Sequence, residues 1–331
     1  MFKTIKIRIQ RMLGGEYPLH FLIYKLYLKN NIISNKFPYK LYRLLSGKSV
    51  SLGSASELMI ETYDRLGQAT HPSVVSFKDN YYLACTPFPY GNDYYENPCL
   101  YRGENGELFR PIEGLCPIAL PQSHDKLVYL SDPFLFVEEK ELRLLYRECL
   151  YSSKQDYEAV IYEMTSADGI TWSEPSRLFS SKRGAMSPCI LKKDGTEFLY
   201  LVMFENEKTS LYRTNIYGQE ETRIRIQNEP NNMMLWHLDF FEDADNTIGL
   251  FTYSTDHFGS NSKLFLATQN TNGSWEVHKE IILDNRYVKK MYKSCVVELD
   301  DGTRNLYVSL RRKDRKWKIY LLKQFDYKIY L

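Results

Sequence analysis

The chain has 331 residues, of which 43 are basic and 41 acidic, so its formal net charge is +2. Hydrophobic residues make up 44% and charged residues 25%, proportions that exclude a mainly disordered chain. The charge is unevenly distributed, because residues 1–50 hold ten basic residues and one acid, Glu16, whereas the remainder is acidic. An acidic body gives no support to nucleic-acid binding, and no nucleic-acid partner is expected.

Residues 1–55 form the first predicted unit, a basic amphipathic segment. Apolar residues at helical spacing over 19–28 and 41–45 predict short helices, which fall short of the roughly 20 apolar residues of a membrane span. No uninterrupted apolar stretch of a secretory signal is visible. We expect this segment to pack on the rest of the chain, to contact a partner protein, or to lie on an anionic membrane surface.

The six cysteines contain no CxxC pair, so zinc-ribbon and thioredoxin-type motifs are not predicted. Most of them lie within apolar strand patterns, where buried free thiols are common. These features predict a reducing, cytoplasmic location, with peripheral contact at the inner membrane surface through residues 1–50 as an option. No metal and no cofactor are expected.

Residues 60–331 form the second predicted unit, in which one scheme occurs five times. Each repeat has a small or polar residue near Pro or His, an apolar strand, a turn and a second apolar strand. The turns read KDN, EEKE, KKDG, EDADN and LDDG, which contain the Asp, Asn and Gly that tight hairpins need. The repeats lie 61, 55, 50 and 57 residues apart, beginning at His71, Asp132, Ser187, His237 and Ser294.

A third strand follows in each repeat, and in three of them it carries a tryptophan near a turn: Trp172, Trp275 and Trp317. Repeats of 50 to 60 residues with three or four strands are typical of propeller blades. The sequence therefore predicts an all-β protein, a five-bladed β-propeller preceded by a mainly helical segment. Two packed sheets are the alternative, but a sandwich is not expected to repeat one signature five times.

In a propeller the first strand of every blade lines the central axis, so equivalent residues of the repeats become neighbours. The polar residues at these positions are His71, Asp132, Ser187, His237 with Asp239, and Lys293. Buried ionisable groups need partners, so this ring is either a hydrogen-bonded plug or a site. Convergent titratable groups in a concavity favour a site.

A second group of candidates lies at the ends of the second strands and in one loop. The strand ends contribute Arg147 with Glu148, Glu205 and Arg311; solvated strand ends are the alternative interpretation. The loop from Thr86 to Pro98 is rich in Pro, Tyr and Asn and contains Asp93 and Glu96. It is either a rigid connector or a lid that stacks Tyr on a sugar and hydrogen-bonds its hydroxyls.

These motifs resemble those of the five-bladed propeller glycoside hydrolases of families 43 and 32. In that group a carboxylate opens the first blade, an Asp in a DP motif the second and a Glu the third. Asp132-Pro133 matches the second position, whereas His71-Pro72 and Ser187-Pro188 stand where the other two carboxylates are expected. The segments TPFPYGNDYYENP, SDP, YRE and WHLD also resemble an uncharacterised set of bacterial and phage propeller proteins.

The resemblance implies a carbohydrate-active protein, and the first hypothesis is an enzyme that cleaves or transfers a glycosyl unit of a bacterial surface polysaccharide. In this hypothesis Asp132 would orient the reacting groups or tune a pKa, Glu148 would be the general acid and Asp239 the general base. The predicted substrate-binding residues are His71, Asp93, Glu96, Arg147, Ser187, Glu205, His237, Lys293 and Arg311.

Two alternatives stay open. A cytoplasmic glycosyltransferase or phosphorylase of capsule or O-antigen synthesis needs fewer enzyme carboxylates. A non-catalytic glycan-binding propeller would explain the substituted first and third positions. A Ser187–His237 pair is conceivable, but its sequence context lacks a nucleophile elbow.

Overall fold

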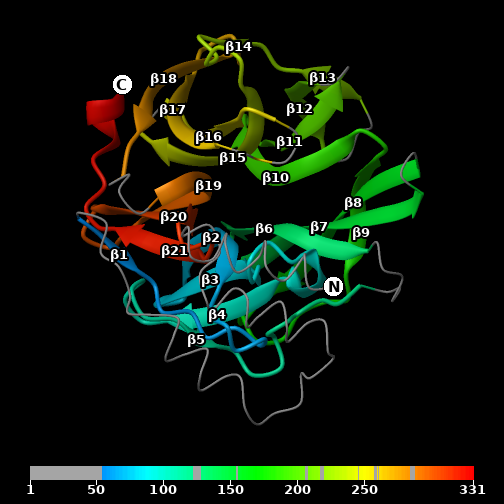
Figure 1. Ribbon diagram of the computed structural model, residues 1–331, viewed down its shortest axis with the longest axis vertical. Coiled ribbons are helices and arrows are strands. Elements are labelled where there is room, and N and C mark those ends of the chain that lie inside the picture. The colour runs from blue at the N-terminus through cyan, green and yellow to red at the C-terminus, as the bar shows by residue number, and fades with distance from the viewer. Residues whose placement is uncertain are drawn as a thin grey trace, which may run out of the picture.

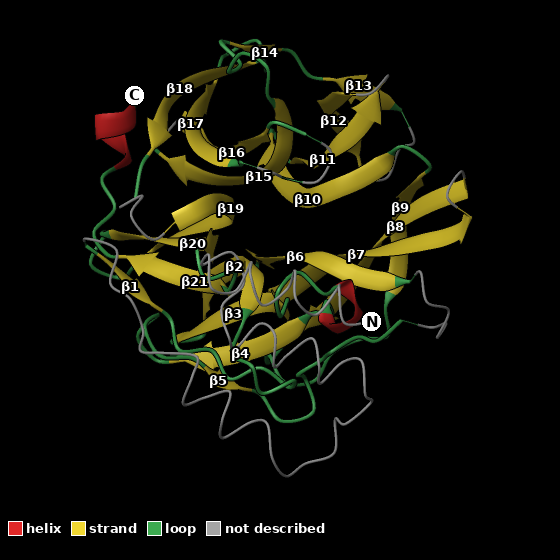
Figure 2. Cartoon of the chain, in the orientation of Figure 1, coloured by secondary structure: helices red, strands yellow, loops and turns green. Residues whose placement is uncertain are grey.

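The computed structural model describes residues 54–331 except 122–127, 154–155, 206–207, 217–219, 245, 257–258, 260 and 284–287. Five sheets, largely antiparallel, stand around one axis, so the fold is a five-bladed β-propeller (Figure 1). Strands make up most of the described chain (Figure 2), together with two short 3-10 helices, η1 (Asp93–Tyr95) and η2 (Tyr327–Tyr330). The predicted all-β propeller is confirmed, whereas the helices predicted before residue 54 lie outside the described residues.

The first three blades are four-stranded sheets whose strands neighbour one another in chain order. Blade 1 contains β2 (Ala69–Phe77), β3 (Asn80–Pro87), β4 (Cys99–Gly103) and β5 (Arg110–Pro111). Blade 2 contains β6 (Tyr129–Glu138), β7 (Glu141–Ser153), β8 (Asp156–Ser166) and β9 (Ser176–Ser181). Blade 3 contains β10 (Gly184–Lys193), β11 (Thr196–Glu205), β12 (Lys208–Asn215) and β13 (Glu221–Arg223).

The last two blades recruit a strand from outside their own repeat. Blade 4 contains β15 (Met234–Asp243), β16 (Asn246–Ser254), β17 (Lys263–Gln269) and β18 (Trp275–Ile281), with β14 (Ile226–Gln227) pairing in parallel with β18. Blade 5 contains β19 (Val288–Glu298), β20 (Arg304–Arg312), β21 (Trp317–Leu322) and, on its outer edge, β1 (Ala55–Glu57).

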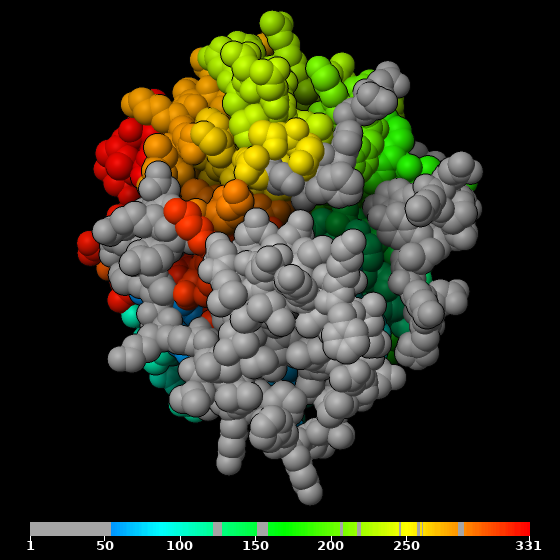
Figure 3. All heavy atoms as spheres, in the orientation of Figure 1, coloured from blue at the N-terminus to red at the C-terminus, as the bar shows by residue number. Residues whose placement is uncertain are grey.

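The strand β1 closes the ring. It pairs antiparallel with β21, with Ala55 opposite Leu322 and Glu57 opposite Tyr320. The propeller therefore begins at Ala55, before the boundary at residue 60 that the repeats predict. In the space-filling view the visible chain colours run from green through yellow and orange to red around the rim, as consecutive blades do (Figure 3).

The hydrophobic core lies between the blades rather than on the axis. Four clusters of buried side chains join blades 1 and 2, blades 2 to 4, blades 4 and 5, and blades 5 and 1. Trp275, which follows the NG turn of blade 4, is fully buried and stacks on Phe240 with ring centroids 4.8 Å apart. Apolar burial of this kind is the main stabilising contribution to folding.

All six cysteines are free thiols, and five of them are buried, as their strand pattern predicts. In the part of the chain that the structure describes, no helix is long and apolar enough to cross a membrane.

Candidate functional site

The innermost strands of blades 1 to 3 share an irregularity at the polar residue of each repeat. His71, Asp132 and Ser187 have positive φ angles of 54°, 51° and 50°. In each strand the register with its neighbour shifts across that residue. A β-bulge of this kind redirects side chains, and such backbone strain concentrates at functional sites. Each of the three strands therefore has a bulge at the residue whose side chain points toward the other two.

Asp132 is the centre of a buried polar cluster that draws residues from four blades. Its Oδ1 lies 3.2 Å from His71 Nε2 and 3.5 Å from His237 Nδ1. Its Oδ2 lies 3.1 Å from Arg147 Nη2 and accepts a hydrogen bond of 3.2 Å from the backbone N–H of Ser187. The structure thus brings together residues that lie up to 166 positions apart in the sequence.

Each histidine of the cluster is held through its Nδ1 atom. His71 Nδ1 lies 3.1 Å from Glu96 Oε1, and His237 Nδ1 lies 2.8 Å from Ser187 Oγ. The Nε2 atoms of both rings and Asp132 Oδ1 are buried and make no hydrogen bond with the described residues. Because buried polar atoms normally have partners, three such atoms in one cluster are typical of a ligand site.

Burial dominates the ionisation of this cluster. It lowers the pKa of His71 to about 3 and that of His237 well below its usual range, against the opposing charge of Asp132. Burial also acts to raise the pKa of Asp132, but Arg147 and the two histidines outweigh it and hold this pKa well below its ordinary value. Burial raises the pKa of Glu96 well above its ordinary value.

His71, Asp132 and His237 are residues that could together hold a metal ion. One ligand atom from each lies within 4.8 Å of the other two. Neutral imidazoles and an ionised carboxylate are the donors that zinc and other first-row divalent metals prefer. The Nδ1 contacts to Glu96 and Ser187 fix the ring orientations, as outer partners of ligating histidines do. The sequence analysis expects no metal, because these residues form no short motif; the fold assembles the donor set.

Ser187 and His237 do not form a catalytic triad with Asp132. In a triad the nucleophile and the carboxylate bind opposite nitrogens of the histidine. Here Ser187 Oγ and Asp132 Oδ1 both approach His237 Nδ1, at 2.8 and 3.5 Å. The hydroxyl of Ser187 therefore orients the ring.

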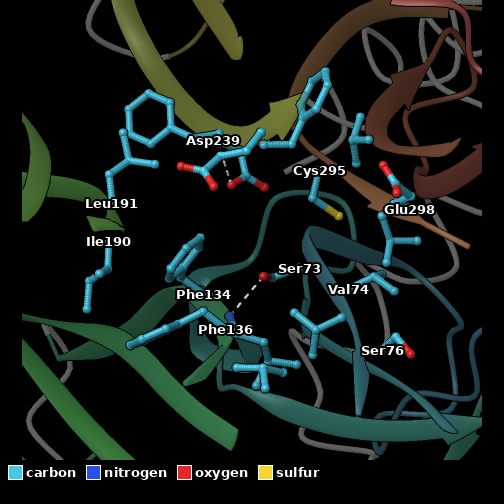
Figure 4. Close-up of a pocket in the computed structure, with 18 of the residues that line it drawn as sticks. Ser73, Val74, Ser76, Phe134, Phe136, Ile190, Leu191, Asp239, Cys295 and Glu298 are labelled. Atoms are coloured by element: carbon cyan, nitrogen blue, oxygen red, sulfur yellow. Dashed lines mark hydrogen bonds between the residues drawn. The ribbon is translucent and has the colours of Figure 1, made fainter. Parts of the chain in front are cut away.

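Lys293 and Asp239 lie further along the axis. Lys293 is fully buried and donates a hydrogen bond of 3.1 Å to the carbonyl of Pro133. Asp239 lines a separate pocket of about 440 Å³ at the later ends of the inner strands, beside Phe134 and Cys295 (Figure 4). Burial raises the pKa of Asp239 to about 7, and the charge of Lys293 opposes this rise. Asp239 is thus a lining residue of another cavity, which does not favour its predicted role as base beside Asp132.

Glu148, the predicted acid, is not brought to the cluster. Its neighbour Arg147 turns toward Asp132, and alternation along β7 turns Glu148 to the opposite side. There its charge raises the pKa of Tyr146 and Tyr162, after the larger effect of their burial. This placement does not favour Glu148 as a catalytic acid at Asp132.

Two predicted binding residues, Glu205 and Arg311, lie outside the cluster as well, whereas Asp93 of η1 acts on it electrostatically. Burial raises the pKa of Asp93 and the charge of Arg147 opposes this rise, while the charge of Asp93 adds to the raised pKa of Glu96. Glu205 pairs with Arg223 at 3.2 Å within blade 3. Arg311 stands opposite Lys290 in blade 5.

Two residues of the site are missing from the sequence-based set. Thr86 Oγ1 lies 3.0 Å from His71 Nδ1. The ring of Tyr292 packs edge-on against His237 and beside His71, with centroids 4.2 and 5.3 Å away. Tyr292 immediately precedes Lys293, the polar residue of the fifth repeat. An aromatic residue next to that position is the sequence feature that could have identified Tyr292 as part of the site.

The same fold occurs in solved structures that share little sequence with this chain. An N-acetylgalactosamine deacetylase from F. plautii, in complex with blood group B trisaccharide, has 16% identity and a TM-score of 0.63, covering 77% of this chain and 89% of that one. A xylan β-1,4-xylosidase from Bacillus halodurans C-125 has 16% identity and a TM-score of 0.62, covering 77% of this chain and 52% of that one. The Bombyx mori family-32 β-fructofuranosidase has 15% identity and a TM-score of 0.56, covering 76% of this chain and 59% of that one.

This chain therefore spans just over half the length of the xylosidase and of the fructofuranosidase. A thermostable family-43 glycoside hydrolase also shares the fold, at 12% identity and a TM-score of 0.62, covering 78% of this chain and 90% of that one. The predicted resemblance to propellers of families 43 and 32 is thus confirmed at the level of fold. No protein-family model matches the sequence, and no curated protein matches it.

Proposed function

We propose that the protein is a metal-dependent hydrolase of glycans, with a divalent first-row metal bound by His71, Asp132 and His237. The observation that carries the proposal is the buried cluster itself. One possible ligand atom from each of His71, Asp132 and His237 lies within 4.8 Å of the other two. In addition, His71 Nε2, His237 Nε2 and Asp132 Oδ1 are buried and make no hydrogen bond with the described residues. The depressed histidine pKa values keep both imidazoles neutral, which is the form that ligates metals.

The reaction that we propose is hydrolysis of an N-acyl group on an amino sugar. When bound by these residues, a metal of this kind would supply an activated water as the nucleophile. The water oxygen joins the acyl carbon, the C–N bond breaks and the departing amine takes up a proton. We propose that Glu96 donates that proton and recovers one from the attacking water, because burial raises its pKa well above the ordinary value. The fold shared with the F. plautii deacetylase supports this choice, and an N-acetylated bacterial surface polysaccharide is the substrate class that we propose.

Cleavage or transfer of a glycosyl unit is the second candidate. Glycosidic hydrolysis typically needs two carboxyl groups, one as acid and one as base or nucleophile. His71 and Ser187 occupy two of the three positions where the resemblance places carboxylates. The raised pKa of Glu96 is the observation that favours this candidate, with Glu96 as the acid and Asp132 as the second carboxyl group, since both contact His71.

Metal binding is tested by titrating the purified, chelator-treated protein with Zn²⁺ and with Mn²⁺. We expect one ion per chain, and a loss of affinity of at least tenfold in His237→Ala and Asp132→Asn. His278→Gln is the matched control, because His278 bonds Thr268 outside the cluster. A wild-type protein that binds neither ion would refute the metal proposal.

The reaction is identified by its products. Metal-restored protein should release acetate from N-acetylated oligosaccharides, and chelation should abolish the release. Metal-independent release of reducing sugar that is lost in Glu96→Gln would instead establish the glycosidic candidate.

A further inference from the structure

Two cations stand side by side on blade 5, close to the cluster. Lys290 of β19 lies opposite Arg311 of β20, and Arg311 lies opposite Trp317 of β21. Directly opposite residues of antiparallel strands share one face of the sheet. The three side chains therefore form a row across three strands.

Neither cation of this pair forms an ion pair with a described carboxylate, although the charge of Asp256 acts on Lys290. Lys290 Nζ donates a hydrogen bond of 2.7 Å to the carbonyl of Gly259, and no described carboxylate forms an ion pair with Lys290 or Arg311. Arg311 Nε is buried and has no hydrogen-bond partner in the part of the chain that the structure describes. The next residue behaves differently, because Arg312 pairs with Glu57 at 3.2 Å and with Asp314 at 3.0 Å. Arg312 is thus tied into the blade, and Arg311 is not.

The electrostatic environment of the pair disfavours positive charge. Burial lowers the pKa of Lys290 to about 8, and the charge of Arg311 adds to this effect against the opposing charge of Asp256. Burial, followed by the charge of Arg315, also lowers the pKa of Arg311. A bound anion would relieve both effects.

The cation pair is linked to the candidate metal ligands by a single aromatic ring. The ammonium of Lys290 lies 4.9 Å from the ring centroid of Trp317 and 5.5 Å from that of Tyr292. Tyr292 in turn packs against both His71 and His237. If a sugar unit binds at the cluster, a substituent on that unit, or the adjoining sugar of the same glycan, would therefore lie near the two cations.

We propose that Lys290 and Arg311 form an anion subsite, so that the glycan substrate carries a carboxylate, phosphate or sulfate group beside the group that reacts. The planar guanidinium of Arg311 matches the paired oxygens of such groups, and Lys290 adds a compact charge. This inference rests on the proposed glycan function and narrows its substrate class to acidic glycans.

The test compares affinities for charged and neutral sugars by isothermal titration with full-length protein. The probes are glucuronate, glucose 6-phosphate and glucose 6-sulfate, with glucose as the uncharged reference. We expect at least one charged probe to bind roughly tenfold or more tightly than glucose, and this preference to vanish in Arg311→Gln and Lys290→Gln. The probe that shows the largest preference identifies the anionic group.

Lys313→Gln is the matched control, because it removes an exposed charge two residues from Arg311. Equal losses in Lys313→Gln and Arg311→Gln would show general charge attraction and overturn the subsite. Equal affinities of all four probes for wild type would also overturn it. Arg311→Lys, which keeps the charge, should retain part of the preference if Arg311→Gln is poorly folded.

The outcome is separable from that of the proposed function. Zn²⁺ titration of Arg311→Gln should match wild type, since Arg311 is not a proposed ligand. Loss of the charged-sugar preference with normal metal binding supports the subsite. Absence of metal binding in wild type, together with a preference that depends on Arg311, would refute the metal proposal and leave the subsite standing.

Discussion

His71 and Ser187 distinguish this cluster from the pattern that the sequence resemblance predicts. Both residues stand where that resemblance leads us to expect carboxylates, and both contact Asp132 of the DP motif. His71 Nε2 faces Asp132 Oδ1, and Ser187 contributes a backbone N–H to Asp132 Oδ2. An imidazole and a backbone hydrogen-bond donor at these two positions favour the proposed metal site over paired-carboxylate chemistry.

Asp64 allows a test of how the burial of one carboxyl group changes the stability of the protein with pH. Burial raises its pKa to about 6, and its Oδ2 is buried without a hydrogen bond. Between about pH 4 and 6 the folded state keeps a proton that the unfolded state has lost, so stability falls as pH rises through this window. Asp64→Asn stays uncharged, so we expect it to be about 1–3 kcal/mol more stable than wild type at pH 8 and similar near pH 4.

Urea unfolding at pH 4, 6 and 8 measures the effect of Asp64→Asn. Glu104→Gln, which removes an exposed carboxylate, should show no such pH-dependent difference from wild type. A gain in Asp64→Asn that is equal at pH 4 and pH 8 would contradict the role assigned to burial.

At the level of single strands, period-two alternation explains both a success and a failure of the sequence analysis. Alternation requires that one of Arg147 and Glu148 face the axis, and the structure selects Arg147 because Asp132 and Ser131 receive its guanidinium. Which of the two residues faces the axis could not be predicted from the sequence, because it depends on Asp132 and Ser131 in the neighbouring strand. The bulges at His71 and Asp132 likewise interrupt the alternation of side chains between the two faces of the strand, which the sequence pattern alone would predict to continue.

The turns between the third and fourth strands of blades 2 and 4 provide a second test. Gly169 has φ +76°, and a Cβ added there would clash with the ring of Tyr82. Gly273, in the equivalent turn of blade 4, has φ +81° and no atom within 4 Å of such a Cβ. We expect Gly273→Ala to cost about 1 kcal/mol for its backbone conformation, and Gly169→Ala to cost clearly more because buried Tyr82 must move.

Thermal unfolding of the two glycine variants separates the backbone cost from the clash. A larger fall in melting temperature for Gly169→Ala than for Gly273→Ala is the expected result. Equal falls would mean that Tyr82 yields without cost, and the packing of blades 1 and 2 around this turn would then be looser than the structure indicates.

For the whole molecule, the repeats were sufficient to predict the number of blades and the convergence of distant residues. His71, Asp132, Ser187 and His237 could be placed together because each opens the inner strand of a blade. The metal-ligand geometry was not predictable in the same way, since it depends on which ring nitrogen each histidine uses and on contacts such as that of Glu96 with His71. The unpaired state of Arg311 also depends on the absence of a described carboxylate nearby, which no local motif encodes.

The sequence repeats place the start of the propeller at residue 60 and so do not include β1, the strand that closes the ring. A prediction about stability follows from the contacts of β1. Glu57 of β1 pairs with Arg312 at 3.2 Å and with Lys318 at 2.8 Å, and the carboxylate is nearly inaccessible to solvent. Removing one partner of a buried ion pair leaves uncompensated charge, which typically costs about 3–5 kcal/mol. Asp314 still accompanies Arg312, so Glu57→Ala should fall at the lower end of that range.

The measurement is urea unfolding of Glu57→Ala beside Glu61→Ala, which removes an exposed carboxylate from the same segment. Glu57→Ala should lower the unfolding midpoint, and Glu61→Ala should leave it within error of wild type. A deletion of residues 54–57 removes the three β1–β21 residue pairs as well, so it should destabilise the protein further than Glu57→Ala does. Should the deletion and the point variant both unfold at the wild-type midpoint, β1 would not be the element that closes the propeller, and stability would rest on blades 1 and 5 packing together without it.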